Sequence, residues 1–244
     1  MNISKTKKLT TIGMLCALAY VAVVAGRIPL VLFLKYDPKD VIIVIGGLIF
    51  GPITSFVVTV IVSVVQMFTI SGTGILGCIM NIISSCSFAC TAAFIYKKKH
   101  KLSGALFGLF CGCGCQVVVM MIWNYLIAPI YMGYPREAIV KLLIPAFLPF
   151  NLIKGGLNAA ITILLYKPVI TALRRSNLIE SKQDSGKMQI NIGVLLVALL
   201  MLITCVLMIL SFNDKPVSVI YTVGLVNLHG KSDHFAEQEI YMRQ

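Results

Sequence analysis

Charged residues are scarce in this sequence, and acidic residues are the scarcest. Only 12% of the 244 residues are charged, with 9 Asp or Glu against 21 Lys or Arg. Soluble domains carry about 25% charged residues, whereas 58% of this chain is hydrophobic and its mean hydropathy is +0.92. This composition predicts a polytopic membrane protein. The basic residues cluster in short stretches between apolar runs, as in cytoplasmic membrane loops, which argues against nucleic-acid binding.

Motifs that would indicate catalysis are also missing. The sequence has no GxxxxGK[ST] segment, so this chain is not itself a P-loop ATPase. Its eight cysteines lie in apolar segments without a nearby histidine or a CxxC spacing, so we expect free thiols and no metal site. The apolar runs contain no set of catalytic acid, nucleophile and metal ligands. We therefore expect neither an enzyme nor a bound cofactor.

Two motifs have structural interpretations that we weigh against functional ones. Asp37-Pro-Lys-Asp40 has the DxxD spacing of metal-dependent prenyl transfer, but no second acidic motif accompanies it. We interpret it as a helix start, with Asp37 as the N-cap, Pro38 at the first helical position and Asp40 at the third. Acidic residues are favourable there because the N-terminus is the positive end of the helix dipole. Gly72-Thr73-Gly74 opens a GxGxxG segment without the preceding strand that a dinucleotide site needs. It is either a turn whose backbone approaches a ligand or a plain turn.

Long uncharged runs define the predicted membrane spans. They cover 9–26, 41–96, 102–135 and 188–213, and the run 142–166 is broken only by Lys154. A span needs about 20 residues, so the longest run must fold back on itself at Gly51-Pro52 and near Gly74. We predict helices near 38–50, 53–70 and 75–96, a long helix ending at Pro129, an external loop, and a helix starting near Pro149. The fold class is therefore all-α.

The basic residues predict the orientation of the chain. Twelve lie in 5–8, 97–101 and 167–187, which fall on one side of the membrane if six spans precede residue 167. The N-terminus is thus expected to be cytoplasmic, in a multi-pass cell-membrane protein. We divide the chain into a six-helix membrane core at 1–187, an extra transmembrane helix at 188–212, and a polar tail at 213–244 that lies outside the cell.

Lys154 is the strongest single indicator of a site. An ammonium group at bilayer depth costs about 3 kcal/mol on insertion scales, so such a residue is a site hypothesis by default. The alternative is a lysine whose long stem reaches the membrane interface. Either end of its apolar run is about a dozen residues away, which makes that reach difficult.

Further polar residues share a predicted depth with Lys154. Asn151, Lys154 and Asn158 fall on one helical face, and Asn124 and Lys154 each lie five residues inside a proline. If Pro129 and Pro149 mark helix ends, both side chains lie about 7.5 Å below the outer surface. With aromatic side chains nearby, these residues predict an outward-facing polar pocket. The alternative is hydrogen bonding between helices through the amides. The aromatic residues are Trp123, Tyr125 and Tyr131.

Three separated segments resemble one known family. KYDPKDVIIVIGGLIFGP at 35–52, WNYLIAPIY at 123–131 and PFNLIKGGLN at 149–158 are similar to the riboflavin-specific substrate-binding (S) components of energy-coupling factor (ECF) transporters. The resemblance covers about residues 8–176. It implies a six-helix fold, capture of riboflavin from outside, and uptake with a transmembrane coupling subunit and two ABC-type ATPases. Riboflavin would be a transported ligand and not a cofactor.

The resemblance also assigns roles to residues. Asn124, Asn151 and Lys154 match family positions that hydrogen-bond the flavin, and Tyr36 lies in a first external loop that resembles the family's lid. Gly13 and Ala17 match the small-residue surface of the first helix that docks on the coupling subunit. The seventh helix and the tail depart from the six-helix pattern. An S component for another vitamin and, less favoured, a membrane enzyme remain as alternatives. The full set of expected ligand-binding residues is Tyr36, Gly72, Thr73, Gly74, Trp123, Asn124, Tyr125, Asn151, Lys154 and Asn158.

Overall fold

The computed structural model describes residues 5–31, 34–70, 74–98, 102–133, 135–175, 198–200, 202–207 and 210. Nearly all of them are helical, which confirms the predicted fold class. The elements in chain order are α1 (Lys5–Gly26), β1 (Ile28–Val31), β2 (Leu34–Tyr36), α2 (Lys39–Phe50), α3 (Pro52–Thr69), α4 (Gly74–Lys98), α5 (Leu102–Met132), α6 (Arg136–Leu142), the π-helix η1 (Leu143–Phe147) and α7 (Leu148–Arg175).

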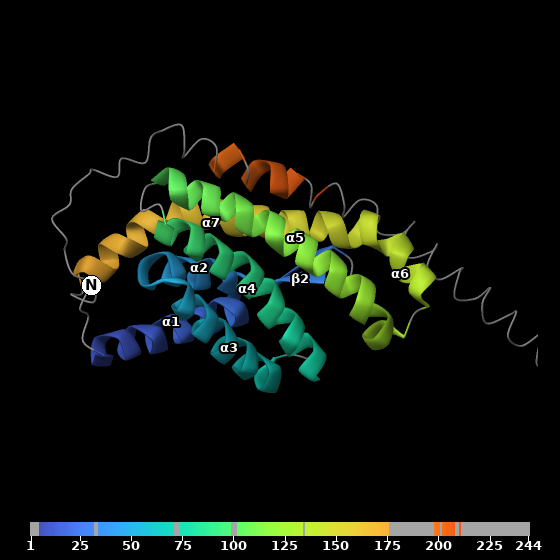
Figure 1. Ribbon diagram of the computed structural model, residues 1–244, viewed down its shortest axis with the longest axis horizontal. Coiled ribbons are helices and arrows are strands. Elements are labelled where there is room, and N and C mark those ends of the chain that lie inside the picture. Colours follow the sequence, from blue (N-terminus) through green and yellow to red (C-terminus); the bar gives the residue numbers. More distant parts are fainter. Residues whose placement is uncertain are drawn as a thin grey trace, which may run out of the picture.

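The helices form one elongated bundle in which successive long elements run in alternating directions (Figure 1). The start of α1, the α4–α5 connection and the end of α7 lie together, at what we call the N-terminal end of the bundle. The α3–α4 and α5–α6 connections lie at the opposite end, and the antiparallel β1–β2 hairpin faces toward it. We call this opposite end the hairpin end.

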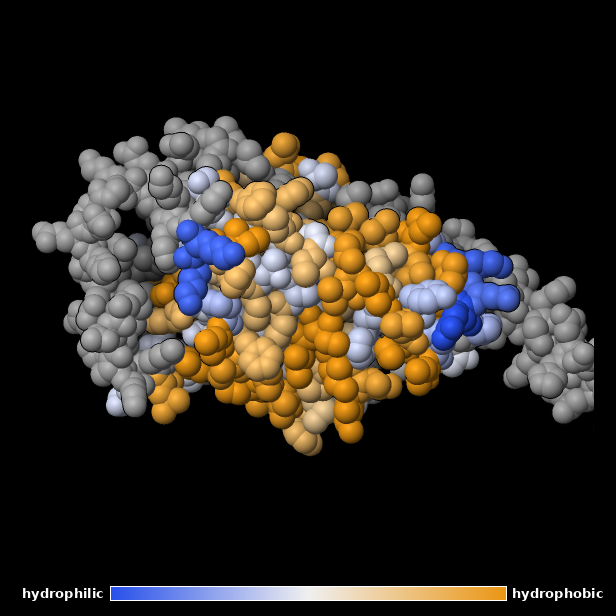
Figure 2. Space-filling view, in the orientation of Figure 1, coloured by the Kyte–Doolittle hydropathy of each residue, from blue (hydrophilic) through white to orange (hydrophobic). Residues whose placement is uncertain are grey.

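The outer surface of the bundle is suited to a lipid environment. Figure 2 shows apolar side chains covering the middle of the molecule, with hydrophilic residues gathered toward its two ends. Among the described residues, five helical segments are long and apolar enough to cross a membrane: Leu9–Gly26, Pro52–Thr69, Gly74–Lys98, Ser103–Ile130 and Arg136–Tyr166. The sixth core helix, α2, has 12 residues and is therefore only about 18 Å long. The chain is a multi-pass membrane protein with a six-helix core.

Glycine allows α4 and α5 to approach each other closely. A Cβ atom at Gly108 would lie 2.7 Å from the carbonyl oxygen of Ala92, and one at Gly112 would lie 2.6 Å from the carbonyl oxygen of Phe88. Both distances are too short for any side chain, so α5 packs directly on the backbone of α4. Lipid provides no hydrophobic driving force between helices, and such small-residue contacts are a usual way for membrane helices to associate.

The helix boundaries correct three predictions. The N-cap of α2 is Pro38, with no side-chain cap hydrogen bond, because the carboxylate of Asp37 binds other partners. Helix α5 does not end at Pro129 but continues to Met132. The expected external loop before α7 is helical, since α6 and η1 lead directly into α7. The predicted helices over 38–50, 53–70 and 75–96, and a start near Pro149, are confirmed.

The π-helix η1 results from a local proline constraint. Pro145 and Pro149 have no N–H group to donate to the carbonyl four residues earlier, and the N–H of Leu148 bonds to the carbonyl of Leu143, five residues back. This wider turn joins α6 to α7 without a break. Of the predicted seventh helix at 188–212, the residues that are described are helical; the rest of that helix and the tail at 213–244 lie outside the described residues.

Candidate ligand-binding site

Lys154 does not reach a membrane interface; it forms an ion pair inside the bundle. Its Nζ lies 3.2 Å from Oδ2 of Asp40 at the start of α2, and it donates a 3.0 Å hydrogen bond to Oγ of Ser84 on α4. Lys154 is 6% exposed and Asp40 is fully buried. A buried pair of this kind is stabilising only when further hydrogen bonds satisfy the remaining lone pairs and protons.

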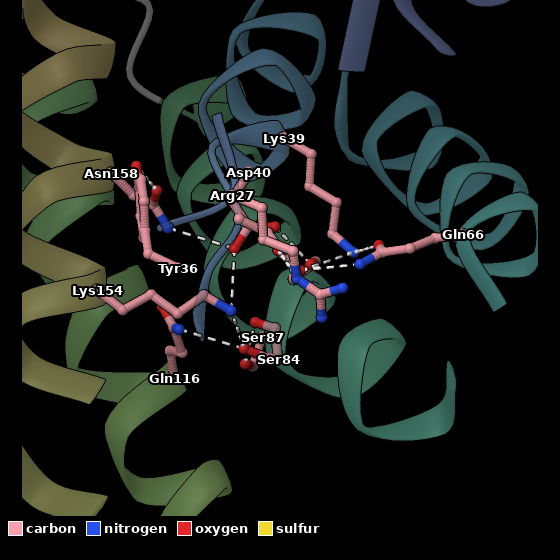
Figure 3. Close-up of polar contacts among 12 residues, drawn as sticks. Arg27, Tyr36, Lys39, Asp40, Gln66, Ser84, Ser87, Gln116, Lys154 and Asn158 are labelled. Atoms are coloured by element: carbon pink, nitrogen blue, oxygen red, sulfur yellow. Dashed lines mark hydrogen bonds and ion pairs between the residues drawn. The ribbon is translucent and has the colours of Figure 1, made fainter. Parts of the chain in front are cut away.

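Asp40 obtains those additional bonds from the same two helices, α4 and α7, and Figure 3 shows Asp40 between Lys154 and Asn158. Ser85 on α4 donates to Oδ1 over 2.5 Å, and Asn158 on α7 donates to Oδ2 over 3.3 Å. Three helices that lie far apart in sequence therefore meet at one carboxylate. We call the group formed by Tyr36, Asp40, Ser84, Ser85, Gln116, Lys154 and Asn158 the central polar cluster.

Tyr36 closes the central polar cluster from the β1–β2 hairpin. Its hydroxyl donates a 2.8 Å hydrogen bond to Oδ1 of Asn158, and its side chain is buried. Burial raises the pKa of Tyr36, and the nearby carboxylates of Asp40 and Asp37 raise it further. The phenol therefore remains protonated at neutral pH and available as a donor.

On its other side the central polar cluster extends to α5. The side-chain amide of Gln116 donates a 3.2 Å hydrogen bond to Oγ of Ser84, so Ser84 accepts from both Gln116 and Lys154. The carbonyl oxygen Oε1 of Gln116 is buried and has no hydrogen-bond partner among the described residues. A free acceptor at this position is available to a ligand that offers an N–H or O–H group.

A second polar group lies beside the first, between the hairpin, α2 and α3 (Figure 3). Asp37 pairs with Arg27 at 3.2 Å and accepts a 3.0 Å hydrogen bond from the amide of Gln66. Lys39 is fully buried, donates to Oε1 of Gln66 over 2.5 Å, and lies 3.9 Å from Asp37. Lys39 therefore bonds to α3, whereas Asp40 bonds to α4 and α7. These two adjacent residues together fix the position of the start of α2.

The two other amides predicted for the pocket are buried on α5 and α7, which pack together. Asn124 donates to the carbonyl of Met120 and Asn151 to the carbonyl of Phe147, each over 2.8 Å within its own helix. Oδ1 of Asn151 and Nε1 of Trp123 are buried, and neither has a hydrogen-bond partner in the part of the chain that the structure describes. The predicted depth of about 7.5 Å was counted from Pro129 and Pro149 as helix ends, and that premise is wrong because the helical structure extends past both prolines.

The remaining predicted residues are not brought to the central polar cluster. Tyr125 is 40% exposed, and the guanidinium carbon of Arg136 lies 5.5 Å from its ring centroid. Gly74 is exposed at the start of α4 with a positive φ of 59°, and Gly72 and Thr73 lie outside the described residues. Gly13 and Ala17 are both exposed on α1, and a Cβ at Gly13 would meet nothing within 4 Å.

Sequence reasoning missed Asp40, Ser84, Ser85 and Gln116 as members of this site. Asp40 was interpreted as a first-turn acid of α2, for which the macrodipole is a sufficient explanation. A signal was nevertheless present. Gln116 is the only residue between 102 and 122 with a side-chain amide, and Asp40 directly precedes the longest uncharged run.

The fold and this cluster define a class of protein: a multi-pass membrane protein with an ion pair and buried amides inside its helix bundle. Polar groups at such positions mark ligand or ion sites in membrane proteins. The sequence model of a family described as "ECF transporter, substrate-specific component" matches residues 7–166. The chain belongs to this family, the substrate-specific (S) components of ECF transporters.

Individual relatives agree with this assignment. The chain is 31% identical to the riboflavin transporter FmnP of Bacillus subtilis (strain 168), over 71% of this chain and 99% of that protein. It is 28% identical to the riboflavin transporter RibU of Staphylococcus aureus (strain TCH60), over 72% of this chain and 96% of that protein. A solved structure described as the S component of a bacterial ECF transporter superposes with a TM-score of 0.62 at 28% identity, covering 70% of this chain and 100% of that one.

Proposed function

We propose that this protein is the riboflavin-binding subunit of an ECF-type vitamin uptake transporter. Riboflavin is the transported ligand and not a cofactor, and the chain itself catalyses no reaction. The observation that carries the proposal is the buried Lys154–Asp40 pair, surrounded by amide and hydroxyl groups from α2, α4, α5 and α7. The similarity to two riboflavin transporters supports the choice of ligand.

The buried hydrogen-bonding groups on α5 and α7 suit a flavin. The pyrimidine edge of a flavin alternates carbonyl acceptors with one N–H donor, and a site needs both kinds of group to match it. Oδ1 of Asn151 is a buried free acceptor and Nε1 of Trp123 a buried free donor, while Lys154 supplies only donors. Asn124 and Asn158 add amides on the same two helices. We propose that these residues, with Tyr36 and Asp40, surround the ligand.

The orientation follows from the distribution of basic residues. The start of α1, with Lys5, Lys7 and Lys8, and the end of α4, with Lys97 and Lys98, lie at the N-terminal end of the bundle (Figure 1). By the positive-inside rule we infer that this end is cytoplasmic. The hairpin end, with Tyr36, then faces the outside and admits the ligand. In this scheme residues 1–187 form the vitamin-binding core, the helix at 188–212 crosses the membrane once more, and the tail at 213–244 is external.

A direct test is to purify the protein after expression in riboflavin-containing cells and to record its absorption spectrum. A yellow protein with a flavin spectrum, which rebinds riboflavin in a calorimetric titration after the ligand is removed, supports the proposal. Binding of a different vitamin in place of riboflavin would keep the family and refute the ligand. A colourless protein that does not respond to riboflavin would also refute it.

Energy must come from a partner, because this chain has no ATPase motif. We propose that a transmembrane coupling subunit with two ABC-type ATPases docks on the exposed face of α1 that carries Gly13 and Ala17, where small residues permit close helix contact. Changing both residues to Leu should abolish uptake by cells that hold the full complex, while riboflavin titration of the isolated subunit stays unchanged. Uptake that survives this change would place the docking surface elsewhere.

A further inference from the structure

The apolar helix Ala198–Leu207, which we call the C-terminal helix, packs on the core although it lies outside the residues that match the family. Figure 1 shows it, in orange, along α5 and α7 on the side of the bundle away from α1. Ala198 and Cys205 are buried, and Leu202 packs against the buried apolar cluster that contains Cys205. These positions share one helical face. The other face is exposed and apolar and includes Leu199, Leu200, Ile203, Val206 and Leu207.

Cys205 packs against Gly156 on α7, where the missing side chain leaves room for the thiol. A Cβ atom at Gly156 would lie 3.0 Å from Sγ of Cys205, so a larger residue at position 156 would press on the thiol. The Sγ atom also lies 4.0 Å from the carbonyl oxygen of Ile153, one turn earlier on α7. The C-terminal helix therefore touches α7 closely at the level of residues 153–157.

This contact is directly behind the central polar cluster. Cys205 belongs to one buried apolar cluster with Tyr36, Phe150, Ile153 and Leu157. Lys154 and Asn158, on the same turns of α7, point inward to Asp40. The ring of Tyr36 thus packs in the apolar cluster that contains Cys205, while its hydroxyl bonds to Asn158. Hairpin, α7 and C-terminal helix are joined through one group of side chains.

We propose that the C-terminal helix is a built-in clamp, which holds Tyr36 against α7 and thereby slows release of the bound ligand. A ligand that moves in either direction between the hairpin end and Lys154 has to open the Tyr36–Asn158 hydrogen bond as it passes. With the C-terminal helix in place, moving Tyr36 also breaks apolar packing around Cys205. This inference rests on the proposed function, because the clamp acts on the proposed riboflavin site. The packing of the C-terminal helix on α7 can be tested without any ligand.

A cross-link tests the packing without any ligand. Because a disulfide needs a Cβ–Cβ distance of about 3.5–4.5 Å, and position 156 is so close to the Cys205 thiol, Gly156→Cys in the full chain should form a disulfide with Cys205 on mild oxidation. Peptide mass spectrometry identifies the pair. The control Gly114→Cys, at an exposed position with nothing within 4 Å of its Cβ, should not bond to Cys205. Absence of the 156–205 cross-link would overturn the clamp.

The dissociation rate of riboflavin then tests whether the clamp slows release of the ligand. Cys205→Phe, which cannot fit beside Gly156, should release riboflavin about tenfold faster than the wild type, with most of the change in the off-rate. The matched control Ile203→Phe adds the same ring to the exposed face and should leave the rate unchanged. Oxidised Gly156→Cys protein should release riboflavin no faster than its reduced form, which covers the case that Cys205→Phe does not fold.

The outcomes separate the two proposals. A cross-linked protein that releases riboflavin faster than its reduced form, or a Cys205→Phe variant that matches Ile203→Phe, overturns the clamp while leaving the proposed function intact. If Gly156→Cys forms the cross-link to Cys205 but the wild-type protein never binds riboflavin, the proposed function is refuted. In that case the clamp fails as a control of riboflavin release, and only the packing stands.

Discussion

Replacing Lys154 with methionine keeps the length of the side chain and removes its charge. In the structure this leaves Asp40, which is fully buried, without the ammonium 3.2 Å away. Removing one partner of a buried ion pair costs about 3–5 kcal/mol, because the remaining charge is uncompensated. For a chain of this length, about 2–4 °C per kcal/mol gives a fall of about 6–20 °C in melting temperature.

A double-mutant cycle separates this effect from ligand binding. Asp40→Asn should also destabilise the protein, but Lys154→Met combined with Asp40→Asn removes both charges and should recover about 1–3 kcal/mol relative to the sum of the single changes. Riboflavin affinity, unlike stability, should not recover in the double variant. Both Lys154→Met variants should lose at least about tenfold in affinity, since a hydrogen bond from a charged donor is worth about 1.5–3 kcal/mol.

The assay is thermal unfolding of the four proteins in detergent, followed by riboflavin titration of each. The reasoning fails if the two substitutions are additive within about 0.5 kcal/mol, because the ion pair would then contribute nothing to stability. It also fails if the double variant regains full riboflavin affinity, since Lys154 would then act only as the counter-charge of Asp40.

Two further predictions concern single contacts. Tyr36→Phe removes the hydrogen bond to Asn158, worth about 1 kcal/mol, and should speed riboflavin dissociation about fivefold in stopped-flow fluorescence; an unchanged rate would show that this bond does not restrain the ligand. Gly108→Ala places a methyl group against the carbonyl oxygen of Ala92 and should lower stability by about 1–3 kcal/mol, whereas Gly114→Ala, which meets nothing within 4 Å, should be neutral or slightly stabilising. Equal melting temperatures for these two alanine variants would mean that α4 and α5 do not pack as closely as described.

Features that depend on local sequence could be predicted from it. Gly51-Pro52 separates two helices because glycine adopts the φ of 96° found there and proline suits the first turn of the next helix. A lysine alone in an apolar run indicated an interior site, since no neighbour or interface could satisfy it. Both arguments need only a few adjacent residues and the properties of the bilayer.

Features that depend on partners far away in the sequence could not be predicted from it. Asp40 and Lys154 are 114 positions apart, and nothing in either segment specifies the other, so the carboxylate was explained by its own helix. The external loop expected before the last core helix contains Arg136, Glu137 and Lys141. Their charges say nothing about backbone conformation, and this segment is helical. Tyr125 was grouped with Asn124 as a neighbour in sequence, although adjacent residues on a helix point about 100° apart.

The wide turn η1 sets the angle by which α6 is rotated about the helix axis relative to α7. One extra residue in a turn rotates everything beyond it by about 100°. With that offset, α6 buries Ile139 completely while its charged residues face out, and α7 still directs Asn151 and Asn158 inward. Deleting a single residue from Leu143–Phe147 would rotate Ile139 by about 100° relative to α7 and turn it toward lipid. An insertion or deletion here therefore changes the orientation of a whole segment, and we expect this short stretch to tolerate substitutions far better than changes in length.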